Sequence, residues 1–468
     1  MTDFLASLFG IAFTLGPFFV AIVLGFLLPL IVVGLSSVSS KWPDHLKLTV
    51  IFAAILIGST LAVAFSGRVL VSQETLAMHP NLMASASLDQ GNVWFSRIAH
   101  LVLLSVSIAE IFLWFLGKRY MGKQQFSIWI AAMAYYVLSV PVSGVLGHYR
   151  GFDINLIYAP IVFTAVALLV STDFKKTLIS MRWLLLIPLL GSLIAIWVAP
   201  NLVLETGYKS LIPGFSIRLA GLTPHANSLG LIAVIAMFLE LSKFVHKKPN
   251  LIFLLISIAN LVLAQSKTAW IIAIIGFAIL SLNALIGYPH NKRYAYILPI
   301  LTGVCFLASI AILLVFTKVD VLQSFLEANQ TGLTSFTGRT KIWEITLNEF
   351  FKNPLYGYGL SIWDQLYRYQ HGMMHVGQAH NQYIQILGQA GLLGVISLSF
   401  YIIQLVRKGC QKWSDTYGFS LLIVIVLLVR GFSESPMRMM GILDFDSFVH
   451  LLVFATIASV AIRTLKKE

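Results

Sequence analysis

Apolar runs long enough to cross a lipid bilayer recur along almost the whole chain. Most hold roughly 17 to 22 residues, and a helix of that length crosses about 30 Å of hydrocarbon. Hydrophobic residues make up 58% of the sequence and charged residues only 11%, against about 25% charged residues in a typical soluble domain. The alternating polar and apolar pattern of a membrane β-barrel is missing. The sequence therefore predicts an all-α, polytopic membrane protein.

The apolar runs correspond to about 12 to 13 transmembrane helices. The first run lacks the basic start and small-residue cleavage site of a signal peptide, so we expect it to be retained. A break at Gly16-Pro17 would divide it into two short pieces and move the amino terminus to the other side. The predicted spans are residues 4–35, 48–66, 95–116, 127–147, 154–171, 183–199, 227–242, 251–265, 269–287, 297–316, 386–406, 417–432 and 447–463.

Lysine and arginine gather in every second loop between these spans. Short loops rich in these residues stay in the cytoplasm, so the remaining loops face the other side of the membrane. The outer loops are then 67–94, 148–153, 200–226, 266–268, 318–385 and 433–446. The basic residues that set this orientation are Lys41, Lys47, Lys118, Arg119, Lys123, Lys175, Lys176, Arg182, Lys243, Lys247, Lys248, Lys292, Arg293, Arg407, Lys408, Lys412, Arg463, Lys466 and Lys467.

The net charge of +13 is therefore mainly a signal of topology. The basic residues are dispersed among short loops, which argues against nucleic-acid binding. No Gly-x-x-x-x-Gly-Lys-Ser/Thr run is present, which argues against a built-in ATPase. Cys305 lies in a predicted span and Cys410 in a cytoplasmic loop, so neither is expected to form a disulfide in the outer domain.

We divide the chain into transmembrane helices with short loops (1–317), a large outer loop (318–385) and carboxy-terminal transmembrane helices (386–468). Within the large loop, the apolar spacing predicts a helix from Lys341 to Phe351 that Asn353-Pro354 ends. A turn at Gly357–Gly359 and a second short helix from Ser361 to Tyr369 follow. The loop is thus expected to form a helical cap, which is either functional or a passive packing element.

Three cations remain on the outer face at membrane boundaries. Arg218 precedes a span, Lys267 lies in the turn between two spans, and Arg339 opens the large loop. Arginine forks and lysine point charges suit a diphosphate at the mouth of a cavity of low dielectric constant. The alternative is that these side chains extend to lipid head groups or bind helix carbonyls.

His380 is the candidate general base. It lies at the membrane edge, and an imidazole there can take a proton from an attacking sugar hydroxyl. His371 and His375 would make a metal site with it only if a carboxylate or cysteine joined them, and the sequence supplies none that fits. We therefore predict neither a metal nor another cofactor. Glu344 and Glu434 are interpreted as helix caps or arginine partners, and Arg430 as a phosphate ligand or the partner of Glu434.

Several ordered motifs over residues 210–435 resemble the O-antigen ligase and polymerase family. They are Arg218 to Asn227 with His225 inside it, Thr337-Gly338-Arg339-Thr340 with Trp343, Asn353 to Gly359, and His380-Asn381 followed after nine residues by Gly391-x-x-Gly394. The resemblance implies a GT-C-like glycosyltransferase of the bacterial inner membrane whose active site faces the periplasm. The expected donor is a glycan linked to undecaprenyl diphosphate, and the acceptor is a growing polymer or lipid A-core.

By this resemblance His380 is the base of an inverting transfer, and Arg339 and Arg218 hold the leaving diphosphate together with Lys267. Supporting residues are Asn381, Trp343, Gly338, Gly391, Gly394, His225 and Arg430. Ser266-Lys267-Thr268 is similar to the exopolysaccharide polymerases of the family, whereas many ligases carry arginine after the serine. This favours a polymerase over a ligase. Two other classes stay open, a transporter of lipid-linked glycans and a non-enzymatic scaffold of the envelope.

Overall fold

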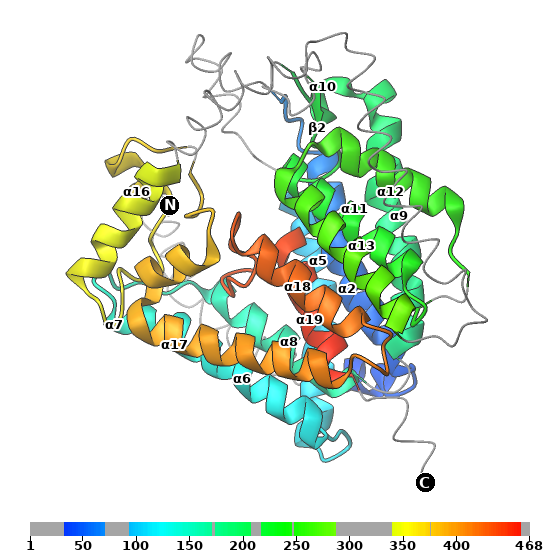
Figure 1. The fold of residues 1–468 in the computed structure, drawn as a ribbon. Helices are drawn as coiled ribbons and strands as arrows, with labels where there is room; N and C mark the ends of the chain where they lie inside the picture. Colours follow the sequence, from blue (N-terminus) through cyan, green and yellow to red (C-terminus); the bar gives the residue numbers. More distant parts are fainter. Residues whose placement is uncertain are drawn as a thin grey trace, which may run out of the picture.

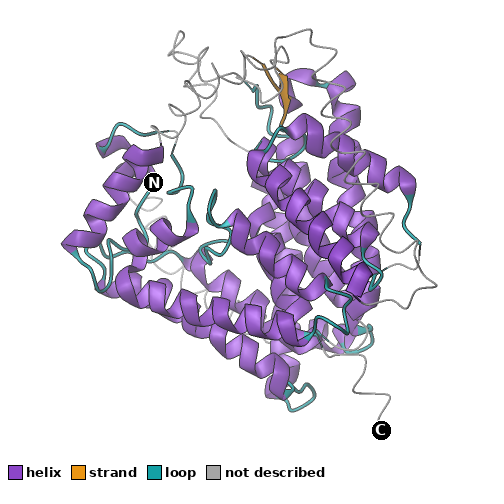
Figure 2. Cartoon of the chain, in the orientation of Figure 1, coloured by secondary structure: helices purple, strands orange, loops and turns teal. Residues whose placement is uncertain are grey.

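The computed structural model describes residues 32–70, 93–170, 174–206, 217–245, 248–286, 339–374 and 376–459. Nearly all regular structure in these residues is helical (Figure 2), which confirms the all-α prediction. The exception is one short antiparallel pair, β1 (Leu204–Thr206) with β2 (Ile217–Leu219), in which Glu205 lies opposite Arg218.

The helices follow the predicted spans closely. Each predicted span within the described residues is helical, while residues 297–316 and most of 4–35 lie outside them. The elements are α2 (Asp44–Ala64), α5 (Val93–Phe115), α6 (Lys123–Ser139), α7 (Pro141–Leu146), η1 (Ile154–Ile157), α8 (Tyr158–Leu169), α9 (Phe174–Val198), α10 (Pro200–Val203), α11 (Ala226–Leu241), α12 (Leu251–Ala264), α13 (Lys267–Ile286), α16 (Gln365–Gln370), α17 (Gln382–Gln411), α18 (Phe419–Arg430) and α19 (Phe445–Ala458).

Five helical segments are long and apolar enough to cross a membrane: α2, α5, α6 with α7, α9 and α17. Six shorter apolar segments accompany them, at η1 with α8, α11, α12, the first part of α13, α18 and α19. Large apolar side chains on α9, such as Ile194 and Trp197, are exposed on the outside of the bundle. In water this surface would be unfavourable, whereas lipid tails match it. A multi-pass membrane protein is confirmed.

The helix α19 lies at the centre of the bundle (Figure 1). It packs against α2, α6, α8, α11, α17 and α18, and every residue except Asp446 is buried. A helix that is apolar all round is stable only when neighbours cover it on all sides. Around it, α2 packs along α5 and α9, and α6 lies beside α17.

Several basic residues that were predicted to lie in loops are instead inside helices. Lys175, Lys176 and Arg182 belong to α9, and Arg407 and Lys408 belong to α17. These helices continue past the edge of the apolar run because a helix satisfies its own backbone.

Buried ion pairs tie together some of the helix ends that were predicted to be cytoplasmic. Glu110 forms ion pairs with Lys47 at 2.8 Å and with Arg119 at 2.7 Å, which joins the start of α2 to the end of α5. Arg182 near the start of α9 pairs with Glu240 near the end of α11 at 2.6 Å. Each pair joins a helix start to a helix end, as expected for neighbouring antiparallel helices.

The part of the large loop that is described forms a compact cap, defined here as residues 339–374 and 376–379. It contains a helix at 339–352 and the short α16, close to the two helices predicted. The cap has its own apolar cluster, separate from the core of the bundle, made of Ile342, Ile345, Ile362, Trp363, Tyr367, Val376 and Ala379.

The cap is joined to α17 where that helix breaks. Gly391 has φ 60° and ψ −153°, inside a helix that otherwise runs on. The loop 353–359 fills the gap: the N–H groups of Leu392 and Leu393 donate to Pro354 and Leu355 at 2.8 and 3.3 Å, and those of Tyr358 and Gly359 donate to Gly388 and Gln389 at 2.7 and 3.0 Å. The break therefore leaves these backbone groups satisfied, as a membrane interior requires.

Glycine at 391 and 394 was expected to let another helix or a lipid chain approach closely. At Gly391 the neighbour is the loop 353–359, since a Cβ there would lie 2.5 Å from the carbonyl oxygen of Pro354. At Gly394 a Cβ would lie 2.5 Å from the Cβ of Ala390 in the same helix. The close approach is therefore made by the cap.

Gly391→Ala is expected to destabilise the protein markedly. The backbone conformation at this position is almost exclusive to glycine and costs another residue about 1–3 kcal/mol, and the added methyl group would also strike the loop. Gly409→Ala is the matched control in the same helix, because a Cβ there meets its nearest atom at 3.5 Å. Thermal unfolding in detergent should show a lower midpoint for Gly391→Ala only, and equal midpoints would contradict this account.

Candidate functional site

His380 immediately precedes α17. Asn381 is the N-cap of this helix, and its side-chain oxygen accepts from the N–H groups of Tyr383 and Ile384 at 3.0 and 3.1 Å. His380 itself has φ 49°, a left-handed conformation that is uncommon for a side chain other than glycine. Its side chain is 30% exposed. Asn381 thus anchors the backbone at the start of α17, and the imidazole of His380 remains accessible beside it.

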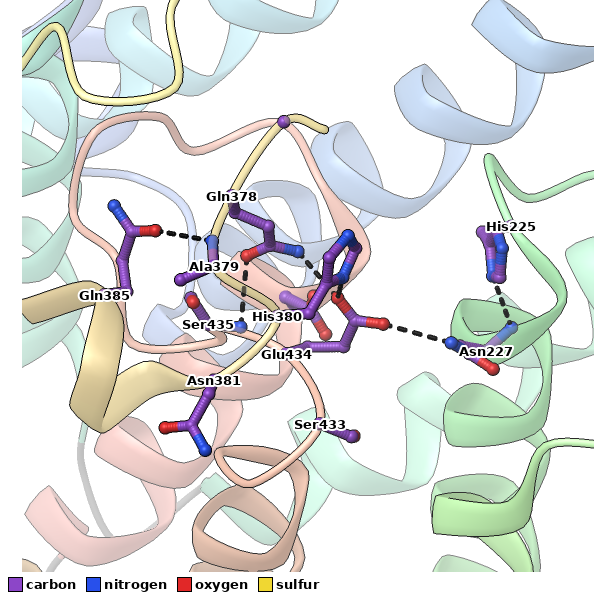
Figure 3. Close-up of polar contacts among 12 residues, drawn as sticks. His225, Asn227, Gln378, Ala379, His380, Asn381, Gln385, Ser433, Glu434 and Ser435 are labelled. Carbon is purple, nitrogen blue, oxygen red and sulfur yellow. Dashed lines mark hydrogen bonds and ion pairs between the residues drawn. The ribbon is translucent and has the colours of Figure 1, made fainter. Parts of the chain in front are cut away.

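Glu434 holds the imidazole of His380. Nδ1 of His380 lies 2.8 Å from Oε2 of Glu434 (Figure 3), and the same oxygen accepts from Nε2 of Gln378 at 2.7 Å. A carboxylate only accepts, so the hydrogen bond places the imidazole proton on Nδ1 and leaves Nε2 as an acceptor. This is the arrangement of a positioned general base.

The carboxylate of Glu434 stays ionised although it is buried. Burial is the largest influence and raises its pKa. The hydrogen bond from His380, the charges of Arg430 and His380 and the hydrogen bond from Asn227 together outweigh burial, and they lower the pKa of Glu434 to about 2. The group that faces Nδ1 therefore carries a full negative charge at neutral pH.

Glu434 is the residue of this candidate site that sequence reasoning assigned to another role. It was interpreted as a helix cap or an arginine partner, and the structure places it against His380 instead. The loop after α18 folds back over the start of α17, where the N–H of Gln382 donates to the carbonyl of Gly431 at 2.7 Å. The signal in the sequence was a carboxylate within a polar outer loop, which did not reveal its partner.

A chain of hydrogen bonds links Glu434 to the segment before α11. Nδ2 of Asn227 donates to Oε1 of Glu434 at 3.0 Å, and Nη2 of Arg218 donates to Oδ1 of Asn227 at 2.7 Å. Arg218, Asn227, Glu434, Gln378 and His380 are called the His380 cluster below. They come from three segments of the chain that are far apart in sequence.

Arg218 is enclosed rather than open to an outer cavity. Only 6% of the residue is exposed. Its Nε donates to the carbonyl of Ala264 at 3.0 Å, and its Nη1 lies 3.7 Å from Oε2 of Glu205. All three guanidinium nitrogens thus have protein neighbours, and the residue reaches Glu434 through Asn227.

His225 caps the start of α11, where its Nδ1 accepts from the N–H of Asn227 at 3.1 Å. The residue has an exposed surface, but protein atoms surround much of its ring and keep water away. This desolvation, followed by the charge of Arg218, lowers the pKa of His225 to about 4. The neutral ring can therefore keep Nδ1 as an acceptor, which helps to hold Asn227 in place.

Lys267 is the first residue of α13 and is exposed. Gln265, two residues earlier, adopts a left-handed conformation, and its side chain donates to the carbonyl of Ile217 at 2.7 Å. Lys267 therefore follows, by three residues, the Ala264 carbonyl that holds Arg218. The structure brings these two predicted cations to one end of the α12–α13 pair.

Trp343 connects the helix at 339–352 to Ala379, the residue before His380. Its Nε1 donates to the carbonyl of Ala379 at 2.9 Å. Arg339 begins this helix, one turn before Trp343, so the helical spacing puts both on one face. Gly338, the preceding residue of the motif, lies outside the described residues.

Arg430 at the end of α18 is buried and pairs with Asp446 of α19 at 3.0 Å. Its charge contributes to the low pKa of Glu434, but its ion pair is made with Asp446. The two expected roles, a phosphate ligand or the direct partner of Glu434, are thus replaced in this structure by a link between α18 and α19.

The other histidines of the cap are placed apart from the His380 cluster. Nδ1 of His371 lies 2.9 Å from the carbonyl of Tyr367, and His375 lies outside the described residues. Among the described residues, no three histidine, cysteine or carboxylate side chains gather at metal-binding distance.

The model of a family described as O-antigen ligase matches residues 252–399. Residues 252–399 of this chain are similar to the O-antigen ligase family. The match confirms the family that the motifs predicted, and this family implies a glycosyltransferase-like membrane enzyme. No curated protein matches the chain at a significant level.

The matched segment covers about a third of the chain. It includes Lys267, Arg339 and His380, and it ends before Glu434. Arg218 and Asn227 precede it. The O-antigen ligase domain thus supplies the histidine, and the flanking segments supply the residues that hold it.

Glu434→Gln is expected to change how stability depends on pH. Because the pKa of Glu434 falls from 4.5 to about 2 on folding, the unfolded chain binds more protons between these values. The contribution of Glu434 is therefore complete above pH 4.5 and is lost as the pH falls towards 2. In detergent, the unfolding midpoint of the unmodified protein should fall more steeply than that of the variant below about pH 4.5. Parallel curves would contradict the assignment.

Proposed function

We propose that this chain transfers a glycan from undecaprenyl diphosphate to an acceptor sugar hydroxyl at the periplasmic face of the bacterial inner membrane. The O-antigen ligase domain and the multi-pass helices support the reaction class. The observation that carries the proposal is the contact between His380 and Glu434, because a charged carboxylate on Nδ1 leaves Nε2 available to take a proton.

In the proposed step, the acceptor hydroxyl oxygen attacks the anomeric carbon of the donor. Its proton passes to Nε2 of His380 as the new carbon–oxygen bond forms. The bond between the anomeric carbon and the diphosphate oxygen breaks, and the diphosphate leaves on its lipid with that electron pair. Attack from the face opposite the leaving group inverts the anomeric carbon. Glu434 stabilises the imidazolium that results.

The leaving diphosphate needs positive charge more than it needs a proton. Arg339 and Lys267 are the proposed ligands, since Lys267 is exposed and Arg339 is partly exposed. We propose that Arg218 contributes from behind, through its charge and through Asn227, in the conformation seen here. No step is assigned to a metal, because these cations supply the counter-charge.

Within the family, we favour polymerisation of an exopolysaccharide or O-antigen. The support is Ser266-Lys267-Thr268, which resembles the polymerases. Ligation to lipid A-core is the second candidate. The name of the matching family, O-antigen ligase, favours it. Both reactions use the same donor, base and cations, and they differ only in the acceptor.

His380→Ala is expected to lower the rate of glycan transfer by about 10²–10⁴-fold, the usual contribution of a general base. Glu434→Gln should lower it by about tenfold or more, because the imidazolium loses its counter-charge. Transfer would be measured with purified protein and lipid-linked glycan, and donor binding should persist in both variants. A transporter would tolerate His380→Ala, and a scaffold would fail only where the cap misfolds.

The control for Glu434→Gln is Glu344→Gln. Glu344 is an exposed carboxylate of the cap, paired with Lys341 at 3.2 Å, and it does not belong to the His380 cluster. The same chemical change at this position should leave transfer unaltered. An equal loss in the two variants would indicate a general charge effect and would argue against the proposed base.

A strain that lacks this chain should separate the two acceptors. If the chain is a polymerase, its loss leaves surface glycans that carry a single repeat unit. If it is a ligase, long chains accumulate on their lipid carrier and are absent from lipid A-core. The sizes are read by gel electrophoresis of the surface polysaccharide and of the extracted carrier lipid. Unchanged glycans of both kinds would reject the proposed function.

A further inference from the structure

The cap contains a pocket that the proposed mechanism does not use. Its volume is about 310 Å³, at the lower end of the roughly 300–1,000 Å³ of ligand pockets. Tyr149 from the loop after α7 and Glu349, Tyr358, Ser361 and His371 from the cap are among the residues that line it. No residue of the His380 cluster lines it.

Two polar atoms of this pocket are buried without a partner. Among the described residues, Oε2 of Glu349 and Oγ of Ser361 make no hydrogen bond. The other oxygen of Glu349 accepts from Lys352 at 2.9 Å and from Tyr367 at 3.2 Å, and the carboxylate is only 5% exposed. A buried polar group without a partner is costly. Glu349 and Ser361, which both line the pocket, therefore each retain an unused hydrogen-bonding atom.

Aromatic rings form another part of the lining. The rings of Tyr149 and Tyr358 are stacked, with centroids 6.0 Å apart and an angle of 6° between their planes. The rings of Tyr367 and His371 are also stacked, with centroids 4.2 Å apart and an angle of 26° between their planes. Burial raises the pKa of Tyr358 to about 12, so its phenol is a neutral donor at physiological pH. Flat rings beside hydroxyl acceptors suit a pyranose, which has an apolar C–H face and a polar rim.

The charge of the lining argues against a phosphate. Glu349 and Asp364 each contribute a negative charge, and Lys352 contributes one positive charge. Apart from the two histidines of the lining, the balance of charge is −1, which repels an anion. Carboxylates accept hydrogen bonds from sugar hydroxyls. A neutral sugar therefore fits this pocket better than a diphosphate.

We propose that this pocket is a saccharide subsite, separate from the base, that binds one sugar of a glycan substrate. The inference rests on the proposed function, since it adds a glycan-binding position to the same enzyme. Tyr367 of the pocket and Ala379, which precedes His380, belong to the same apolar cluster. A sugar held here would therefore lie against the unit that positions the base.

Ser361→Ala tests the subsite with little risk to folding. It removes a buried hydroxyl that has no partner, so the unfolding midpoint should stay the same or rise. Affinity for the repeat-unit oligosaccharide, released from the surface polysaccharide of the source strain, should fall about three- to tenfold. Glu349→Gln should weaken it by about tenfold or more because a charged acceptor is lost. Binding is measured by calorimetry on the whole protein in detergent.

Ser242→Ala is the matched control. Oγ of Ser242 is also buried without a hydrogen-bond partner among the described residues, but this serine follows α11 and does not line the pocket. Its replacement should leave oligosaccharide affinity unchanged. Inorganic phosphate, titrated separately, should not compete with the oligosaccharide. Wild-type affinity in both Ser361→Ala and Glu349→Gln, or competition by phosphate, would overturn the inference.

The proposed function and the subsite fail in different ways. His380→Ala should abolish transfer and keep oligosaccharide binding. If His380→Ala remains active, the proposed mechanism is wrong whatever the pocket binds. If it is inactive while Ser361→Ala and Glu349→Gln bind normally, only the subsite is wrong. In transfer assays, a raised KM for the acceptor alone assigns the pocket to the acceptor glycan, and a raised KM for the donor alone assigns it to the donor glycan.

Discussion

The carboxylate of Glu434 is the point at which three distant parts of the chain meet. One oxygen faces the imidazole and the amide of Gln378, and the other faces Asn227, which in turn binds Arg218. A buried carboxylate without partners would take up a proton or destabilise the fold. Here His380, Arg430 and Asn227 keep it charged. The tautomer of His380 and the packing of the loop after α18 both depend on that charge.

The membrane bundle makes this arrangement possible because it leaves few backbone groups unsatisfied. The central α19 is covered on all sides, and the break in α17 is filled by the loop 353–359. The β1–β2 pair serves a similar purpose for Arg218, which it places opposite Glu205. The residues of the His380 cluster all lie near helix ends or in the segments next to them, where hydrogen-bond partners are available.

Much of the architecture could be predicted from the sequence, because lipid imposes simple rules on length and composition. Apolar runs marked the helices, and Asn353-Pro354 marked the end of the helix at 339–352. His380 and the cations could be singled out since few polar residues remain on the outer side. The ends of α9 and α17 were placed too far inwards, because hydropathy marks the limit of the apolar run and not of the hydrogen-bonded helix.

The contacts between segments could not be predicted in the same way. Glu434 lies 54 residues after His380, and nothing local to either one specifies the other. Arg218 was expected to be open, yet the strand pair and Asn227 enclose it. Arg430 was considered as a partner for Glu434, but Asp446 on the adjacent helix binds it directly. Such pairings depend on how distant segments pack, which a single sequence does not encode in any local pattern.

The interlocked backbone at Gly391 has a mechanical consequence. Four main-chain hydrogen bonds fasten the cap to both halves of the broken α17, and His148 and Tyr149 donate to the far side of the same loop at 3.0 and 2.7 Å. The loop 353–359 is therefore held by main-chain hydrogen bonds to α17 and to residues 148–149. If α17 tilts, the loop 353–359 must move with it. The imidazole of His380, at the start of α17, then moves together with the cap.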